Sequence, residues 1–257
     1  MNITITDLNL LTAFWLVFSR WLSILIQLPL FEHVNIPPLV KVLTALIISY
    51  GFFPGVSNEV MKDVILFNDS FWVLTIFYTL SGLLIGYLVR SIMSIFTASG
   101  SIITQQIGFG AIRYFDPMSA EQVGPFEQII QWTMLIIVIG SGALIPMFKG
   151  VHLSFATVNL HSLKDFSTIT PFFLDMFKGL FMSSLLLATP LIFINMLIMT
   201  VLGIISKAVP QMNIIMVSFV LNIGLGLLIF SASSSEFFYV AFQKYTDHLG
   251  RWFQYII

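Results

Sequence analysis

Long apolar runs, separated by short polar stretches, fill most of the 257-residue chain. The runs cover residues 8–31, 41–53, 70–89, 128–148, 179–206 and 214–230. Apolar residues follow one another in these runs without strict alternation, which favours helices over β-strands. Because about 20 apolar residues cross a bilayer as a helix, the pattern predicts an all-α membrane domain over residues 1–257 with about six apolar helical segments, several of them long, bent or broken by Pro or Gly. Helix is expected to continue past Arg90, since no turn signal follows before Gly100.

Proline and charged residues predict where these helices break. Pro54 closes the second run, and a polar loop is expected from there through Glu59, Lys62, Asp63 and Asp69. A connector is expected after the fourth run, with Lys149, His152, His161, Lys164 and Asp165 in it. Pro190 is expected to interrupt the fifth run and Lys207–Asn213 (KAVPQMN) to separate it from the sixth, because proline has no N–H to donate. Beyond residue 230, a serine-rich and aromatic tail suits an interfacial helix or a docking surface.

Composition places the chain in the membrane. Hydrophobic residues make up 58% of it and charged residues 9%, whereas a soluble domain carries about 25% charge. The net charge of −1, with no basic block, makes nucleic acid an improbable partner. The absence of cysteine excludes disulfides, thiol chemistry and Cys-ligated metal. No basic segment precedes the first apolar run, so we expect no cleaved signal peptide and a first helix that stays in the protein.

Arg20 is the clearest charge inside an apolar run, where an arginine costs about 2.5 kcal/mol or more. The nearest acids, Asp7 and Glu32, lie more than three helical turns away. Its partner is therefore expected on another helix, on another subunit, or among backbone carbonyls. The alternative is that the side chain extends to the membrane interface.

Small residues predict close helix packing in the third segment. Gly82 and Gly86 are four residues apart, a spacing that lets two helices approach closely. Arg90, which ends this run, is predicted with Arg20 as a buried charge or packing residue. Farther along, a stripe of small and polar residues recurs at helical spacing: Ser91, Ser94, Ala98, Ser101 and Gln105. This stripe either packs against a neighbouring helix or faces a water-filled path.

A glycine-containing segment near the middle of the chain, Gln105–Pro117 (QQIGFGAIRYFDP), lies between two apolar runs. Its glycines free the backbone to leave helical geometry. One interpretation is an ordinary connector. The other is a plug that closes a pore, because non-helical backbone at membrane depth needs protein or water around it. The candidate plug residues are Gly108, Phe109, Gly110, Ala111, Ile112, Arg113, Tyr114, Phe115, Asp116 and Pro117.

The sequence contains no pattern typical of an enzyme. The four histidines are expected in loops or in the tail, and none forms an HExxH motif. No GxxxxGK[ST] stretch is present, and few acids fall inside an apolar run, which argues against a P-loop and against a proton relay. We therefore predict no catalytic residues, no metal and no cofactor.

Four motifs, in order along the chain, resemble the FliR family of flagellar biosynthesis proteins. The first combines Arg20, Pro29 and Phe31 with IPP at 36–38 and VKV at 40–42. The second is GLLIGYLVR at Gly82–Arg90, and the third is the central segment QQIGFGAIRYFDP. The fourth, KAVPQMNI, is the most specific and includes Lys207, Pro210, Gln211 and Asn213. The chain departs from the family where the phrase FPLK is usual, since Phe219–Asn222 reads FVLN, and at Arg113 and Tyr114 of the central segment.

The resemblance implies a structural core subunit of the flagellar type III protein export gate in the bacterial inner membrane, at the flagellar basal body. FliR-like proteins assemble with FliP-like and FliQ-like subunits into a helical channel and contact an FlhB-like subunit. Unfolded flagellar proteins are the exported substrates. The resemblance also implies a FliP-like part over residues 1–170, FliQ-like helices over 171–257, and a plug role for the central loop.

Three alternatives are weighed against this prediction. The first is the equivalent subunit of a virulence type III secretion injectisome. The second is a secondary transporter of a small solute, which should show internal repeats and ionisable residues at the midplane of the membrane. No clear repeat is seen, and intramembrane acids are scarce. The third, an intramembrane enzyme, lacks a nucleophile paired with a base in any known motif.

Overall fold

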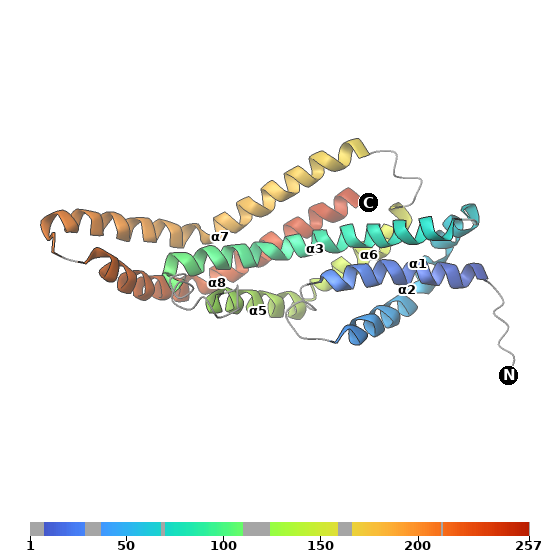
Figure 1. Ribbon diagram of the computed structural model, residues 1–257, viewed down its shortest axis with the longest axis horizontal. Coiled ribbons are helices and arrows are strands. Elements are labelled where there is room, and N and C mark those ends of the chain that lie inside the picture. Colours follow the sequence, from blue (N-terminus) through green and yellow to red (C-terminus); the bar gives the residue numbers. More distant parts are fainter. Residues whose placement is uncertain are drawn as a thin grey trace. The chain divides into compact units, whose positions relative to one another are not determined.

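The structure is a computed structural model that describes residues 8–28, 37–67, 70–109, 124–158, 166–211 and 213–256. These ranges contain helices and turns and no strand. In chain order the helices are α1 (Leu8–Gln27), α2 (Pro38–Leu66), α3 (Phe71–Ile107), α5 (Pro125–Gly140), α6 (Leu144–Thr157), α7 (Phe166–Ala208) and α8 (Ile214–Ile256) (Figure 1).

Five of these helices are long and apolar enough to cross a membrane, namely α1, α2, α3, α7 and α8. The pair α5 and α6 together would make a sixth, broken span. The predicted all-α membrane fold is therefore confirmed. Helix also continues past Arg90, as expected, to Ile107.

The chain divides into two compact units that share its longest helices. Unit 1 comprises Met1–Met93, Ala143–Leu174 and His248–Ile257, and unit 2 comprises Ser94–Gly142 and Asp175–Asp247. Helices α3, α7 and α8 each contribute to both units. The predicted FliP-like and FliQ-like parts, divided after residue 170, concern the family resemblance and stay a prediction.

Aromatic rings form much of each unit's core. In unit 1, the buried Trp21 of α1 lies 5.1 Å from Phe52 of α2 and 5.6 Å from Phe148 of α6, between ring centres. In unit 2, Phe230 of α8 lies 4.8 Å from Phe126 of α5 and contacts it edge to face. Such pairs add about 0.5–1.5 kcal/mol to the area that each ring buries.

The polar loop predicted after Pro54 is wrong, because α2 continues to Leu66 and contains Glu59, Lys62 and Asp63. Four residues at helical spacing explain the continuation, since Val56, Val60, Asp63 and Val64 are all buried on one face of α2. Their burial offsets the single backbone hydrogen bond that Pro54 removes. Asp69 lies outside the described residues.

The fourth run was predicted as one helix and is two. Helix α5 ends at Gly140 and α6 begins at Leu144, with Gly142 at φ +73° between them. A residue with a side chain is strained in this left-handed conformation, so glycine makes the turn possible. The connector predicted after this run is also wrong in part, because Lys149 and His152 lie in α6. His161, Lys164 and Asp165 lie outside the described residues.

Two further breaks were predicted in places where the helices continue. Pro190 lies inside α7 and does not end it, and the tail beyond residue 230 is part of the 43-residue α8, not a separate interfacial helix. The serines of this stretch fit a helix because their hydroxyls donate to carbonyls of the preceding turn: Ser233 to Ile229 at 2.8 Å and Ser234 to Ser231 at 3.0 Å.

The KAVPQMN break, in contrast, is confirmed, since α7 ends at Ala208 and α8 begins at Ile214. The side-chain oxygen of Asn213 accepts a hydrogen bond from the backbone N–H of Met216 at 3.3 Å. Asparagine at this position caps the first turn of α8 by satisfying one of its free N–H groups.

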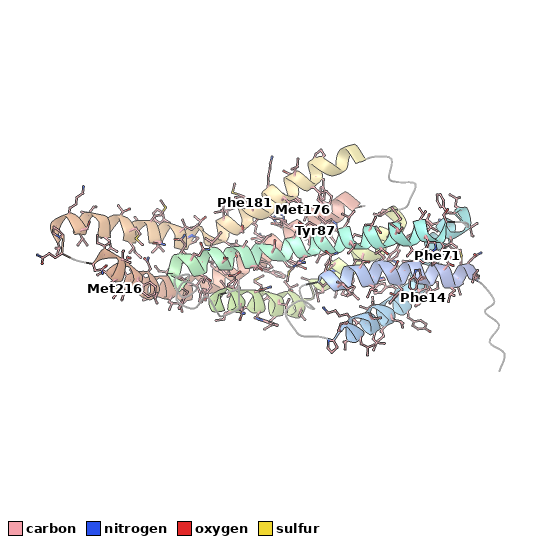
Figure 2. The ribbon with its side chains drawn as sticks, in the orientation of Figure 1. Phe14, Phe71, Tyr87, Met176, Phe181 and Met216 are labelled. Atoms are coloured by element: carbon pink, nitrogen blue, oxygen red, sulfur yellow. The ribbon has the colours of Figure 1, made fainter. Side chains whose placement is uncertain are left out.

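Much of the apolar surface of the long helices is uncovered within the chain. Only 22% of the most apolar stretch is buried in α7 and in α8, and 17% in α2. Phe181 and Met216, labelled in Figure 2, are each about two-thirds exposed. A 43-residue helix is about 65 Å long, roughly twice the hydrocarbon thickness of a bilayer. Protein neighbours could cover apolar surface that extends beyond that thickness.

Candidate functional site

Arg20 is fully buried in unit 1 and is bonded to the C-terminal end of α6. Its Nη1 donates to the carbonyl oxygen of Ser154 at 3.0 Å and to the Ser154 hydroxyl at 3.4 Å, and its Nη2 donates to the carbonyl oxygen of Val158 at 3.2 Å. Carbonyls at the C-terminal end of a helix carry partial negative charge, so they suit a cation, and the Ser154 carbonyl accepts from Arg20 in addition to the backbone N–H of Val158. The acceptors of Arg20 are thus helix-end groups from a distant part of the chain.

Two aromatic rings contact the guanidinium of Arg20. Its central carbon lies 4.4 Å from the ring centre of Tyr78 in α3 and 4.4 Å from that of Phe155 in α6. The Tyr78 hydroxyl in turn donates to Asp63 Oδ2 in α2 at 2.8 Å. One buried cation and one buried carboxyl group are therefore joined through a tyrosine, and the group links α1, α2, α3 and α6.

Sequence reasoning found Arg20 but missed Tyr78 and Asp63. Asp63 was assigned to a polar loop, and nothing in the spacing of Tyr78 distinguishes it from the other aromatic residues of its run. A signal was available, because Asp63 follows Val56 and Val60 at helical spacing and would then face the core.

Gly82 and Gly86 lie where α3 meets α1. A Cβ atom added at Gly82 would be 2.6 Å from the carbonyl oxygen of Arg20 and 2.9 Å from the Cβ of Ser23. At Gly86 it would be 3.0 Å from Nε2 of Gln27, whose amide donates to the carbonyl oxygen of Leu83 at 2.7 Å. Only glycine allows so close an approach, and the approach at Gly82 is made by the backbone of Arg20 itself.

The central loop, which comprises the candidate plug residues Gly108–Pro117, begins where α3 ends. Gly108 has φ +96°, and a Cβ atom placed there would be 3.6 Å from Ile223 and 3.7 Å from Phe219 of α8. The ring of Phe109 stacks on that of Phe126 with 6.3 Å between their centres. The other candidate plug residues, Gly110, Ala111, Ile112, Arg113, Tyr114, Phe115, Asp116 and Pro117, lie outside the described residues.

Side-chain amides meet beside the start of this loop, all in unit 2. Asn195 of α7 donates through Nδ2 to the backbone carbonyl of Gln106 at 3.2 Å and to the side-chain oxygen of Gln106. Asn222 of α8 lies in the stretch where the chain departs from the family phrase FPLK. It is buried and lines a small cavity together with Asn195 and Gln106.

The remaining predicted residues lie at the surface of the chain. Arg90, predicted as a buried charge or packing residue, is instead exposed in α3. The residues predicted in the KAVPQMN motif are exposed at the end of α7 and in the break before α8: Lys207, Pro210, Gln211 and Asn213. In the polar stripe of α3, Ser91 is buried, whereas Ser94, Ala98 and Gln105 are exposed. Three of the five residues of that stripe are therefore exposed at the surface of this chain.

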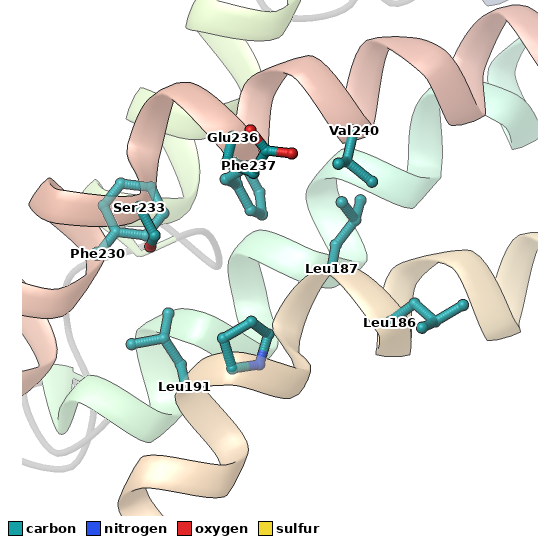
Figure 3. A pocket seen from close by; sticks show the side chains of 9 residues that line it. Leu186, Leu187, Leu191, Phe230, Ser233, Glu236, Phe237 and Val240 are labelled. Carbon is teal, nitrogen blue, oxygen red and sulfur yellow. The ribbon is translucent and has the colours of Figure 1, made fainter.

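An apolar groove lies between α7 and α8 in unit 2 (Figure 3). It has a volume of about 140 Å³ and is lined mainly by aliphatic and aromatic residues, among them Leu187, Leu191, Phe230 and Phe237. Figure 3 shows α7 changing direction beside Leu191, which follows Pro190 in the sequence. Glu236 supplies the one charged group in the lining.

Nothing in the described ranges assembles a metal site, since they contain no cluster of three or more His, Cys, Asp or Glu residues able to hold one. The polar groups described above bond instead to helix ends and to one another. Fold and site together define a helical membrane protein whose buried polar residues join its helices.

Comparison with known proteins identifies the family. The model of the family described as "Bacterial export proteins, family 1" matches residues 11–248, and the chain belongs to this family. The chain is similar to the flagellar biosynthetic protein FliR of Bacillus subtilis, with 23% identity over 91% of this chain and 90% of that protein. It is also similar to FliR of Borreliella burgdorferi, with 31% identity over 62% of this chain and 61% of that one.

A further relative is not a FliR protein by name. The surface presentation of antigens protein SpaR of Shigella flexneri is 23% identical over 86% of this chain and 85% of that protein. The predicted resemblance to the FliR family is confirmed. The chain is thus a membrane-embedded component of a bacterial export apparatus.

Proposed function

We propose that the chain is a structural core subunit of the flagellar type III protein export gate in the bacterial inner membrane. With FliP-like and FliQ-like subunits it would form a helical channel, in contact with an FlhB-like subunit, through which unfolded flagellar proteins leave the cell. The observation that carries the proposal is the family match over residues 11–248. In this role the chain binds neighbours and lines a path, and it performs no catalysis of its own.

The exposed apolar surface supports the assembly with other subunits. Helices α2, α7 and α8 leave most of their apolar stretches uncovered within the chain, and the exposed face of α3 includes Ser94, Ala98 and Gln105. Lipid can cover an apolar helix, but small and polar residues at the surface of a membrane helix typically face protein or water. A multi-subunit channel supplies both protein neighbours and a water-filled path.

The equivalent subunit of a virulence injectisome is the second candidate, favoured by the similarity to SpaR. Deleting the gene in its own host distinguishes the two. We expect loss of flagellar filaments and of swimming, with restoration by the intact gene on a plasmid. Normal filaments together with lost secretion of effector proteins would instead support the injectisome role.

Expression without neighbours is expected to leave the chain unstable. When it is produced alone it should be degraded or aggregate, because α2, α7 and α8 then expose apolar surface that subunits normally cover. Co-expression with the FliP-like and FliQ-like proteins of the same host should raise the amount of tagged chain recovered and bring both partners with it. A stable, monodisperse monomer purified in mild detergent would argue against assembly as the source of stability.

The central loop is proposed to close the channel at rest. Gly108 turns the chain away from α3, and the following segment carries Ile112, Tyr114 and Phe115, which are bulky enough to exclude water and ions from a narrow passage. Arg113 and Asp116 are three residues apart and could form an ion pair that holds one closed conformation. A partly hydrated pair contributes at most about 1 kcal/mol, so the tie is weak. Such a weak tie would let the exported protein displace the loop.

Deleting Gly110–Tyr114 should therefore make cells that carry the assembled gate leak small ions and solutes. Replacing the same five residues by a Gly-Ser segment of equal length is the matched control for loop length. If the bulky side chains seal the passage, both variants should leak while the complex stays assembled. An intact complex that remains tight in both variants would refute the plug, and loss of assembly without leakage would show that the loop only connects helices.

A further inference from the structure

A small cavity in unit 2 is lined by three carboxamide side chains. It lies among α3, α7 and α8 and has a volume of about 10 Å³. The amides are Gln106 of α3, Asn195 of α7 and Asn222 of α8, and the rest of the lining is Gly226 and aliphatic side chains. Three amides that meet in so apolar a setting need partners for every donor and acceptor.

Two acceptors of this group have no donor among the described residues. Asn195 uses its Nδ2 for Gln106, but its own Oδ1 is buried and unpaired, and so is Oδ1 of Asn222. Asn222 is only 7% exposed, and both Oδ1 atoms are buried from solvent. Leaving a buried acceptor unpaired costs about 1–3 kcal/mol. Both asparagines line one cavity, and one donor there could satisfy both oxygens.

We propose that this cavity binds one water molecule, which donates one hydrogen bond to Asn195 Oδ1 and the other to Asn222 Oδ1. A cavity needs about 10–15 Å³ to hold a single water, which matches the space present. A water has two hydrogens, equal to the number of unpaired acceptors. A hard cation such as Ca²⁺ takes about six to eight oxygen ligands, several of them charged, and this lining supplies no carboxylate.

Helical spacing brings the site together. On α7, Leu191, Ile194, Asn195 and Ile198 recur at three- and four-residue intervals and share one face. On α8, Asn222 and Gly226 are four apart, and a Cβ atom added at Gly226 would be 3.0 Å from Cγ1 of Ile107. Because Gly226 has no side chain, the last turn of α3 approaches α8 closely enough for Gln106 to line the same cavity as the other two amides.

The bound water would fix the residue at which the central loop leaves α3. Gln106 lies two residues before Gly108, where the backbone turns, and its carbonyl and side chain are both held by Asn195. This consequence rests on the proposed function of the loop. The water site itself rests only on the contacts within unit 2.

The direct test is an experimental map of the full-length protein, in its complex, at a resolution that shows ordered water. We expect a density peak within hydrogen-bond distance of both Oδ1 atoms. A protein donor at either oxygen, or no peak, would overturn the proposal. Because this measurement does not depend on leakage, a bound water with a loop that fails to seal would overturn only the plug.

A second test uses the thermal midpoint of the purified complex carrying Asn195→Leu, Asn222→Leu or both, with Ile198→Leu as the volume-matched control at the same cavity. Each asparagine variant should lower the midpoint. The double variant should lower it by less than the sum, because it removes both acceptors together with the water that they share. Additive losses would overturn the shared water. So would a midpoint that falls when choline replaces sodium, since that result would assign the site to a cation.

Discussion

Replacing Arg20 by alanine is expected to lower the free energy of unfolding by about 2–4 kcal/mol, from the cavity and the lost charged hydrogen bonds together. The carbonyls of Ser154 and Val158 lose their guanidinium donors, and the rings of Tyr78 and Phe155 lose the cation that both contact. The thermal midpoint of the purified complex that contains the chain, and the amount of assembled complex recovered from membranes, should both fall.

Two further substitutions of Arg20 separate the contributions of its charge, its hydrogen bonds and its packing to stability. Arg20→Lys keeps the charge but lacks the planar fork that reaches two carbonyls at once, so it should restore stability only in part. Arg20→Met fills the space without donors and measures the packing contribution. Arg251→Ala, at an exposed position of α8, is the control for loss of an arginine. Wild-type stability and assembly in the alanine variant would contradict a structural role for Arg20.

Gly82→Ala is expected to destabilise the chain by about 1–3 kcal/mol, although alanine is the better helix former. The new methyl group would lie 2.6 Å from the carbonyl oxygen of Arg20, an atom of rigid backbone, so α1 and α3 must move apart. That movement would also disturb the contact of the Arg20 guanidinium with Tyr78 on α3. The thermal midpoint in detergent and the amount of folded protein per cell measure the effect.

Gly203→Ala is the matched control, because a Cβ atom there would meet nothing within 4 Å. Both glycines lie inside long apolar helices, so the two variants share the change in helix propensity and differ in contact. Alanine at residue 203 should leave the midpoint unchanged or raise it by the equivalent of at most about 1 kcal/mol. Equal behaviour of the two variants would mean that α1 and α3 are free to separate at Gly82.

The membrane class and most of the helical segments could be predicted from sequence, because a long uncharged run satisfies its backbone in lipid only as a helix. Arg20 could be selected because a charge stands out in such a run, and Gly82 and Gly86 because their spacing allows close approach. What failed was the treatment of proline and polar residues as helix ends. Pro54 and Pro190 each remove one hydrogen bond, and burial of neighbouring side chains and the continuing helix outweigh that loss.

The partners of the buried polar groups could not be predicted, because they depend on contacts between distant parts of the chain. Ser154 and Val158 lie 134 and 138 residues from Arg20, and no local pattern marks them. Asn222 was noted as a departure from the family, but its place beside Asn195 and Gln106 follows only from how α3, α7 and α8 pack. For the central loop, the plug role stays a prediction, since the structure describes only its first two residues, Gly108 and Phe109.

The separation between Arg20 and its acceptors also has a consequence during biosynthesis. Ribosomes add about 5–20 residues per second, so α1 is made roughly 7–27 s before Ser154 exists. Throughout that interval the guanidinium has none of its native acceptors on α6. The nascent first helix must therefore keep Arg20 at a hydrated interface, or in contact with another protein, until α6 is synthesised and the two can dock.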